Sequence, residues 1–241
     1  MKVLFTSVLC FCILLINAQE SQNTTWENGK PKDVYSSVGK NIIRYTYYNP
    51  DGIKMADGSY RQGRKHGPWH IYYPSGTLKG RFYFYKGAED GKQIFYLETG
   101  EKEAEYTYKQ GKKEGEYILY YPNAKPKEKG QYAIIPFRSY LPAPPPQSDS
   151  LLLHLPGMAS VKSGKITQYY ESGKIKVIQY FDSQYDILVN HESKENNILF
   201  RLQNKEIPTG IWTYFDENGK ISLQEIYKQG QLSDRIETVS P

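Results

Sequence analysis

Cysteine is nearly missing from this chain: only two of its 241 residues are Cys, and both, Cys10 and Cys12, lie among the first eighteen. Residues 1–18 have a basic start, an almost wholly apolar run and a small final residue, Ala18. This pattern is typical of a secretory signal peptide, and the apolar run is too short to span a membrane. We therefore expect cleavage near Ala18 and a mature chain without disulfides or thiol chemistry.

The expected compartment follows from the same absence. Small secreted animal domains usually depend on disulfides, whereas a cysteine-free exported chain fits a bacterial periplasm or cell surface. We therefore expect a bacterial protein that is secreted, periplasmic or held at the cell surface, with no transmembrane segment in the mature chain.

Charge of one sign is not concentrated either. Without Lys2, the mature chain has 30 basic and 26 acidic residues, a net charge of +4. Proteins that bind nucleic acids gather more positive charge than this on one face. We therefore expect no nucleic-acid partner.

Residues arranged for catalysis or metal binding are scarce as well. The chain has no G-x-S-x-G elbow, no phosphate-binding glycine loop and no H-E-x-x-H motif. Among four histidines (His66, His70, His154 and His191), the close pair His66 and His70 flanks a predicted turn and strand without a third ligand nearby. We predict a protein that is not an enzyme and holds no cofactor or metal. A hydrolase whose site forms under residues 133–163 stays open as an alternative.

Tyrosine and glycine, by contrast, are abundant, with 23 and 20 copies. They recur in rows, the first four of which are spaced 24 residues apart; the rows begin at Ile43, Gly67, Gly91, Gly115, Gly164 and Gly210. The sixth position of every row is aromatic: Tyr48, Tyr72, Tyr96, Tyr120, Tyr169 and Phe215. A repeated unit of this length indicates an array of stacked supersecondary units.

One row shows what the unit is. "GPWHIYY" predicts a strand, "PSG" a turn and "TLKGRFYFY" a second strand. An Asn, Asp or Ser before Gly supplies the positive backbone angles of a tight hairpin. Because one hairpin is only marginally stable in water, the rows must stack. The predicted fold class is all-β: an elongated antiparallel meander of tandem hairpins of about 24 residues, with irregular end units and a Pro-rich insertion.

The segments "YKQGKKEGEYILYYPNAK" and "YRQGRKHGPWHIYYPSGTLKG" resemble the variant MORN repeat, in which rows of the form Y-x-x-G-x-x-x-G-x-W/Y-x-x-Y/F-x-x-x-G recur in tandem. The resemblance covers 43–134, then 164–181 and 207–231. It implies an elongated β-hairpin array used as a scaffold or binding surface. Some relatives are labelled antitoxins, a role that does not fit an exported chain.

The interruptions of the pattern divide the chain. "PAPPP" cannot join a sheet ladder, so its segment is predicted to leave the sheet as a surface loop or a docking arm. The predicted organisation is a signal peptide (1–18), an N-terminal degenerate or capping segment (19–42), repeats (43–134), the Pro-rich insertion (135–163), repeats (164–234) with a degenerate hairpin (182–207), and a tail (235–241).

The candidate binding residues are all aromatic: Trp69, Tyr72, Tyr96, Tyr120 and Trp212. Both tryptophans occupy the third position of their rows and are candidate stacking platforms for a glycan. The tyrosines are predicted to form a ladder across the sheet, and such cross-strand aromatic pairs also have an ordinary structural role.

The function predicted from these features is an exported, non-enzymatic repeat scaffold that binds another envelope or secreted protein. The alternative is a cell-surface module that binds glycan or anionic lipid headgroups through aromatic and basic residues of the sheet. The basic turns "QGRKHG" and "QGKKEG" favour this alternative.

Overall fold

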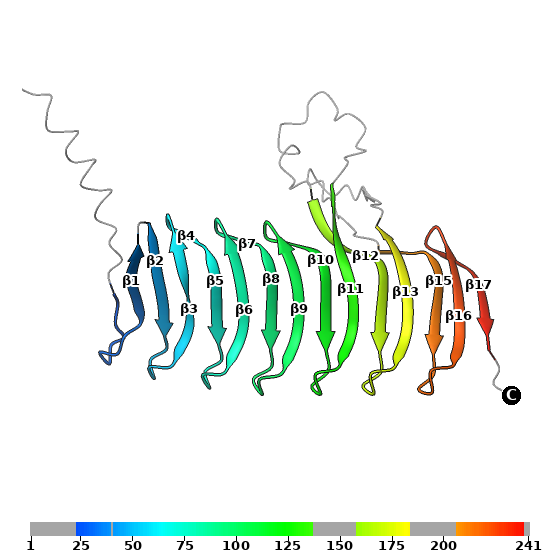
Figure 1. Ribbon diagram of the computed structural model, residues 1–241, viewed down its shortest axis with the longest axis horizontal. Helices are drawn as coiled ribbons and strands as arrows, with labels where there is room; N and C mark the ends of the chain where they lie inside the picture. Colours follow the sequence, from blue (N-terminus) through cyan, green and yellow to red (C-terminus); the bar gives the residue numbers. More distant parts are fainter. Residues whose placement is uncertain (1–22, 40, 137–157, 184–205, 239–241) are drawn as a thin grey trace, which may run out of the picture. The chain divides into compact units, whose positions relative to one another are not determined.

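The computed structural model describes residues 23–39, 41–136, 158–183 and 206–238, and every helix or strand assigned within them is a β-strand (Figure 1). The chain divides into two compact units, Met1–Ala88 with Glu98–Gly100 and Glu89–Leu97 with Glu101–Pro241. The predicted signal peptide and the tail beyond residue 238 lie outside the described residues.

The first unit is an antiparallel meander. Its strands are β1 (Asp33–Gly39), β2 (Ile42–Tyr48), β3 (Lys54–Arg61), the short β4 (Arg64–Lys65), β5 (Gly67–Tyr72) and β6 (Leu78–Tyr85). The pairs are β1 with β2, β2 with β3, β3 with β4 and β5, and β5 with β6. Each strand therefore pairs with its neighbour in the chain, as stacked hairpins require.

The short strand β7 (Ala88–Glu89) lies at the boundary between the two units. After it, the second unit repeats the antiparallel arrangement. Its strands are β8 (Gly91–Tyr96), β9 (Lys102–Lys109), β10 (Lys112–Tyr120), β11 (Pro126–Pro136), β12 (Met158–Tyr169), β13 (Ile175–Ser183), β14 (Glu206–Pro208), β15 (Gly210–Phe215), β16 (Ile221–Lys228) and β17 (Gln231–Glu237). They pair antiparallel in chain order, with both β14 and β15 beside β13. The predicted all-β meander of hairpins is confirmed in both units.

The turn inside each row differs from the expectation. Tyr73 N–H donates to the Thr77 carbonyl, and Gly76 N–H donates back to the Tyr73 carbonyl, both at 2.8 Å. Only the glycine of this turn has a positive φ (86°), whereas Ser75 before it does not. The prediction of positive angles at both positions was wrong, because this is a three-residue loop in which one left-handed residue closes the turn.

Two consecutive positive φ angles occur instead in the turn between rows. Gln62 and Gly63 have φ values of 52° and 72°, and Gln110 and Gly111 have values of 49° and 79°. Positive φ at both central residues is typical of a type I′ turn, whose twist matches that of the strands. The sequence signal there is Gln-Gly rather than Asn-Gly.

Neighbouring turns of the second unit are bonded to each other. The Tyr121 hydroxyl donates to the Tyr169 carbonyl (2.8 Å), and Lys125 Nζ donates to the Ser172 carbonyl (2.7 Å). One row further, the Tyr170 hydroxyl and Lys174 Nζ make the equivalent bonds, to Phe215 and Glu217. These bonds fix the stacking of successive rows at their turns.

The N-terminal segment of the first unit makes the same kind of bonds. Trp26 Nε1 donates to the Tyr48 carbonyl and Lys30 Nζ to the Asp51 carbonyl, both at 2.9 Å. This segment therefore packs on the first full row as another row would. The capping role expected of residues 19–42 stays a prediction.

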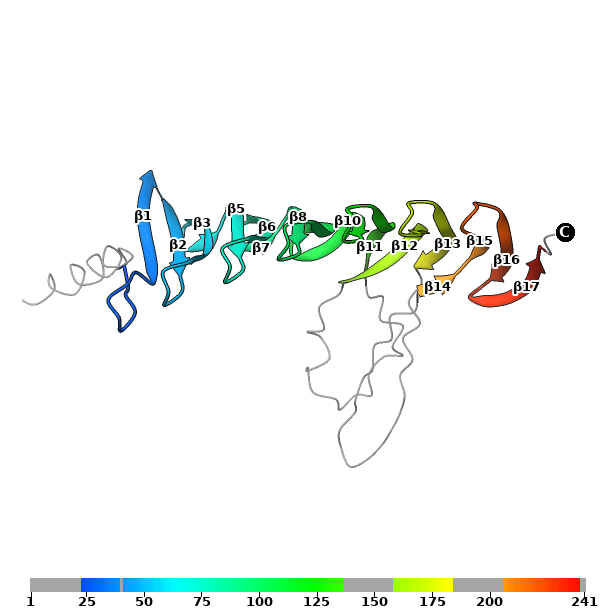
Figure 2. The same cartoon turned by 90° about the horizontal axis from the view of Figure 1, so that it is seen from below.

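Alternation along the strands gives each unit two faces, and most of the core lies on one of them. The third position of the rows is 0–2% exposed at Trp69, Gln93, Tyr117 and Ile166. We call the face that carries this column the inner face and the opposite one the outer face. Figure 2 looks along the strands and shows them bent rather than flat. Bending lets a single sheet enclose the side chains of one face.

Two glycines make room for the largest inner rings. A Cβ at Gly58 would lie 2.1 Å from the Trp69 ring, and one at Gly130 would lie 2.8 Å from the Tyr117 ring. Neither glycine has a positive φ. Their role is therefore close approach of a ring to the backbone rather than turn geometry.

The sheet extends further into the predicted insertion than expected. β12 begins at Met158 rather than Gly164, and its first residues pair with the end of β11, for example Val161 with Ala133. Val161 is 5% exposed, so its burial accounts for this extension. Residues 137–157 of the insertion and 184–205 of the degenerate hairpin lie outside the described residues.

We predict that Gly58→Ala lowers the free energy of unfolding by about 1–3 kcal/mol, because the new methyl group overlaps the Trp69 ring. Urea denaturation of the full chain measures this. In a Trp69→Val background, Gly58→Ala should lower the free energy of unfolding by much less. An equal cost in both backgrounds would show that the Trp69 ring is not the obstacle.

Ala124→Gly should have the opposite effect. Ala124 occupies the glycine position of its turn with φ 61°, a conformation that costs an L-residue roughly 1–2 kcal/mol. Glycine removes this strain from the folded state, but its greater freedom in the unfolded chain offsets part of the stabilisation. We therefore expect a net stabilisation of about 1 kcal/mol. Thermal unfolding should show a higher Tm, whereas Gly173→Ala, the reverse change one row on, should lower it.

Candidate functional site

The first candidate, Trp69, is part of the core. Its ring is 2% exposed and is surrounded by the rings of Tyr45, Tyr60 and Phe84, with centroids 5.1–6.1 Å away. Its Nε1 donates to the Ser59 carbonyl at 3.1 Å. A ring in this position has no free face to stack on a sugar, so the structure does not support the platform expected at Trp69.

Trp212 occupies the equivalent position on β15 but is only half-buried. Its ring contacts Phe181 and Tyr227, with centroids 5.1 and 4.5 Å away, and its Nε1 donates to the Tyr180 carbonyl at 3.0 Å. The two tryptophans lie in different units. A binding role for Trp212 stays a prediction.

Two of the three candidate tyrosines are bonded to carboxylates of the outer face. The Tyr72 hydroxyl donates to Asp57 (2.7 Å), and the Tyr120 hydroxyl donates to Glu105 (3.0 Å). Tyr96, at the end of β8, is half-buried. These contacts give Tyr72 and Tyr120 a structural role, while ligand binding by the three tyrosines stays untested.

Each carboxylate also has basic partners. Asp57 accepts from Lys54 and lies 3.0 Å from His70 Nδ1. Glu105 is 6% exposed and pairs with Lys92 (3.0 Å) and Lys102 (2.7 Å). Burial by itself would raise the pKa of Glu105, but the hydrogen bonds from Lys102, Lys92 and Tyr120 outweigh it and lower this pKa to about 2.

A third such cluster lies on the inner face of the second unit. The buried Glu128 accepts hydrogen bonds from the Tyr117 hydroxyl, from Lys162 (2.8 Å) and from Gln168 (3.0 Å). Burial opposes ionisation of Glu128, yet these donors lower its pKa. Burial and the bond to Glu128 raise the pKa of Tyr117. Both carboxylate oxygens of Glu128 therefore have hydrogen-bond donors within the protein.

The histidines do not form a metal site in the described part of the chain. His70 pairs with Asp57, and the His66 ring lies 5.8 Å from that of Tyr85. No group of three His, Cys, Asp or Glu residues able to hold a metal ion occurs among the described residues. His154 and His191 lie outside them.

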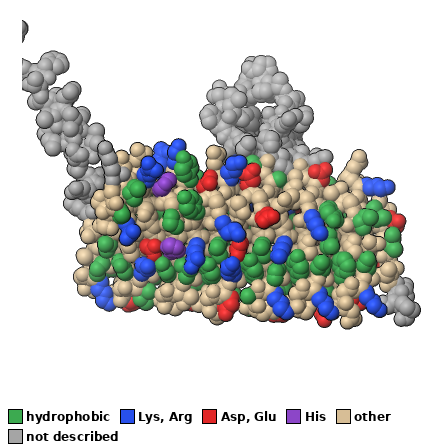
Figure 3. All heavy atoms as spheres, in the orientation of Figure 1, with side chains coloured by type: hydrophobic (Ala, Val, Ile, Leu, Met, Phe, Trp, Pro, Cys, Tyr) green, Lys and Arg blue, Asp and Glu red, His purple; other side chains and the backbone are tan. Residues whose placement is uncertain are grey.

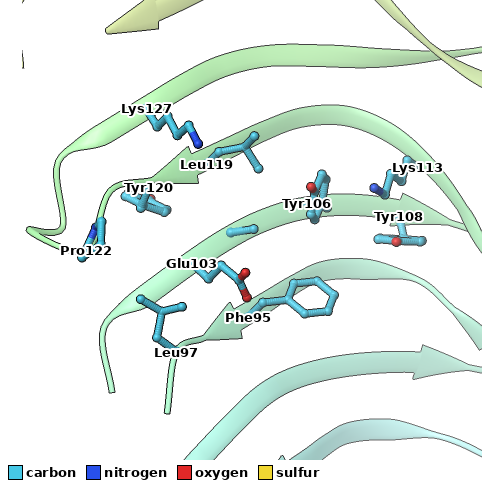
Figure 4. A pocket seen from close by; sticks show the side chains of 11 residues that line it. Phe95, Leu97, Glu103, Tyr106, Tyr108, Lys113, Leu119, Tyr120, Pro122 and Lys127 are labelled. Carbon is cyan, nitrogen blue, oxygen red and sulfur yellow. The ribbon is translucent and has the colours of Figure 1, made fainter. Parts of the chain in front are cut away.

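The inner face of the second unit contains a hollow of about 540 Å³, which we call the inner hollow (Figure 4). Its lining is mostly aromatic and aliphatic, and three of the lining side chains are charged. The lining residues are Phe95, Leu97, Glu103, Ala104, Tyr106, Tyr108, Lys113, Leu119, Tyr120, Pro122 and Lys127. In Figure 4 Lys113 lies beside Tyr106 and Tyr108 at one end, and Leu97 and Pro122 lie at the other.

The outer face of the same unit has an uncharged patch over β13, β15 and β16. A shallow hollow of about 490 Å³ there is lined by Ile178, Tyr180, Gly210, Ile211, Thr213, Phe215 and Gln224. Tyr180 and Ile211 are 38% and 48% exposed. On β17, Ile236 lies opposite Gln224 and is 46% exposed. We call these residues the outer patch. Figure 3 shows hydrophobic side chains gathered on this face.

Comparison with protein families identifies the repeat. Residues 113–133, 162–183 and 208–229 match the family described as the MORN repeat variant. The chain contains variant MORN repeats. The resemblance expected from the sequence is thus confirmed, and the three matched segments each cover a strand–turn–strand row of the second unit. MORN repeats are generally protein- or lipid-binding modules.

Other comparisons add little. Two structures of TarM, one of them a mutant of the S. aureus protein, share 9% and 11% identity over 46% and 54% of this chain, with a TM-score of 0.28. The chain spans about a quarter of their length (24% and 23%). A porin-like protein from Bacteroides uniformis shares 10% identity over 85% of this chain and 92% of its own, with a TM-score of 0.24. No curated protein matches the chain.

Sequence reasoning missed the carboxylate clusters. Asp57 and Glu105 occupy the same position of their rows, two rows apart, but the other rows carry Arg81 and Lys129 at this position, so the column by itself gave no signal. The missing information was that the sixth-position tyrosine of the next row reaches back to each acid. Strand pairing supplies that information, for it places neighbouring rows in register.

We predict that the stability of the protein falls as pH drops from the ordinary Glu pKa of 4.5 towards 2, in part through Glu105. Its native pKa is below its unfolded value, so its contribution is present above pH 4.5 and is lost on acidification, by roughly 1–3 kcal/mol. Glu105→Gln should flatten this pH dependence in urea denaturation. Glu116→Gln, at an exposed site, should leave it unchanged; equal slopes in all three proteins would contradict the prediction.

Proposed function

We propose that this protein is an exported, non-enzymatic MORN-repeat scaffold that binds another envelope or secreted protein through the outer patch. The observation that carries the proposal is the uncharged, partly exposed apolar surface over β13, β15 and β16. The centres of protein interfaces are depleted in charge and enriched in aromatic side chains, as this patch is.

The patch stands out from the rest of the outer face. Around β9 that face is built from ion pairs of Glu105 with Lys92 and Lys102. At the row positions of Glu105 and Lys92, β13 and β15 carry Ile178 and Ile211, and no residue that lines the hollow is charged. Exposed apolar surface of this kind, rimmed by polar residues, marks an interaction site.

A docked protein fits the patch better than a strand added to the sheet edge. β17, the last described strand, carries Asp234, Arg235 and Glu237, all exposed. Charged residues on an edge strand guard against pairing with another strand. The proposed contact is therefore made to the face of the sheet.

Export rests on the sequence of residues 1–18, and the absence of catalytic motifs supports a binding role. In the described residues no helix is long and apolar enough to cross a membrane. The glycan alternative relied on stacking by the two tryptophans, and the burial of Trp69 removes one of these platforms.

The test is site-specific photocrosslinking in the native envelope, with the crosslinker placed at Ile211 and, for comparison, at the exposed Val38 of the first unit. We expect a discrete heteromeric product from position 211 alone. The captured protein, once purified, should bind the wild type at least about tenfold more tightly than a Tyr180→Asp, Ile211→Asp variant. A Val38→Asp variant should bind like the wild type.

Three outcomes would contradict the proposal. A product with the mass of two copies of this chain would identify the patch as a self-association surface. Equal crosslinking at both positions, or equal affinity of the patch variant and the Val38→Asp control, would show that the outer patch is not the contact. Fractionation of cells that express the full chain tests export separately.

A further inference from the structure

The inner hollow holds a lysine that the fold leaves without an acidic partner. Lys113 Nζ lies 3.6 Å from the ring centroid of Tyr106 and 5.3 Å from that of Tyr132. Among the described residues, its ammonium group makes no ion pair and no hydrogen bond. The side chain is half-buried, so its charge has lost part of its hydration without gaining a carboxylate.

The neighbouring row shows what a paired lysine looks like here. Lys162, on β12, also lies over an inner ring, that of Tyr117, at 5.6 Å. Its Nζ is 2.8 Å from Glu128, which satisfies it. Lys113 has the same aromatic setting without the carboxylate, and an open hollow lies beside it.

The charges around Lys113 set its protonation. Burial lowers the pKa of Lys113, the field of Lys162 lowers it further, and the field of Glu89 opposes both. Two other charged side chains line the hollow, Lys127 and Glu103. An anion beside Lys113 would restore the missing partner and raise this pKa.

We propose that the inner hollow binds an organic monocarboxylate, with the carboxylate at Lys113 and the apolar body against Phe95, Leu97 and Leu119. The volume of about 540 Å³ lies within the usual range for small-molecule sites, roughly 300–1,000 Å³. Cation–π contacts from Tyr106 and Tyr132 hold the ammonium group in place, and the aliphatic end of the hollow takes up a hydrocarbon body.

The lining also decides against other ligands. Glu103 opposes a ligand of high negative charge, so one carboxylate fits better than inorganic phosphate. An uncharged molecule of the same shape would leave the Lys113 ammonium unpaired. The site lies on the opposite face from the outer patch, so this inference goes beyond the protein-binding function and does not depend on it.

The test is titration of the purified mature chain with 3-phenylpropionate and with octanoate. Calorimetry measures the binding, and NMR of the ¹³C-dimethylated lysines measures the pKa of Lys113. We expect saturable binding and an upward shift of the Lys113 pKa. Lys113→Met keeps the length of the side chain and should weaken binding roughly tenfold or more, whereas Lys113→Arg should retain much of it. Binding should weaken as pH rises through the lowered pKa of Lys113.

Matched controls keep the result interpretable. Lys65, in the first unit, lies over the rings of Trp69 and Phe84 in the same way, at 4.6 and 5.0 Å, so Lys65→Met should leave the affinity unchanged. 3-Phenylpropanol and phosphate should bind far more weakly than the carboxylates. Equal binding of the alcohol, equal binding by folded Lys113→Met, or no carboxylate binding at millimolar concentration would overturn the proposal.

Discussion

The packing of large rings from one row onto the backbone and rings of the next is the contact on which the rest of this protein depends. In the described parts of the chain each unit is a single bent sheet without a second layer over it. Within these parts, Trp69 and Tyr117 are buried by neighbouring strands of their own sheet, at glycines that let them approach the backbone. Because each row completes the burial of its neighbour, a lone row would be unstable and the array is the folding unit.

The inner packing explains the polar chemistry around it. Tyrosine brings a hydroxyl wherever it brings a ring, and a half-buried hydroxyl requires a partner. The carboxylates of Asp57, Glu105 and Glu128 supply acceptors, and lysines neutralise them. These clusters thus hold neighbouring rows of the scaffold together.

The two faces of the second unit offer different chemistry because strand alternation separates them. The outer patch is uncharged and shallow, which suits another protein surface. The inner hollow is aromatic and contains an ammonium group that has no acidic partner among the described residues, which suits a small anion. A repeat scaffold can combine two such sites because each row can vary independently at positions that do not pack on its neighbours.

The sequence by itself determined the period, the strands and their order. Recurrent aromatics and glycines predict hairpins, and hairpins in series pair with their neighbours, since only short turns connect them. The turn type was less certain from sequence, because Asn-Gly, Asp-Gly and Ser-Gly fit several loops and the choice depends on how the strands twist. The end of the Pro-rich insertion was also misplaced by several residues, as Met158–Ser163 contain no repeat signal and are strand through pairing with β11.

Only the tertiary structure decided which aromatic residues are buried and which are accessible. Trp69 and Trp212 occupy equivalent positions in the sequence, yet the first is enclosed and the second is half-buried. Exposure depends on the side chains that neighbouring rows contribute, and periodicity gives the position of a residue in its row but not the volume around it. The same limit applies to Lys113, whose lack of a carboxylate becomes apparent only when the facing strands are in place.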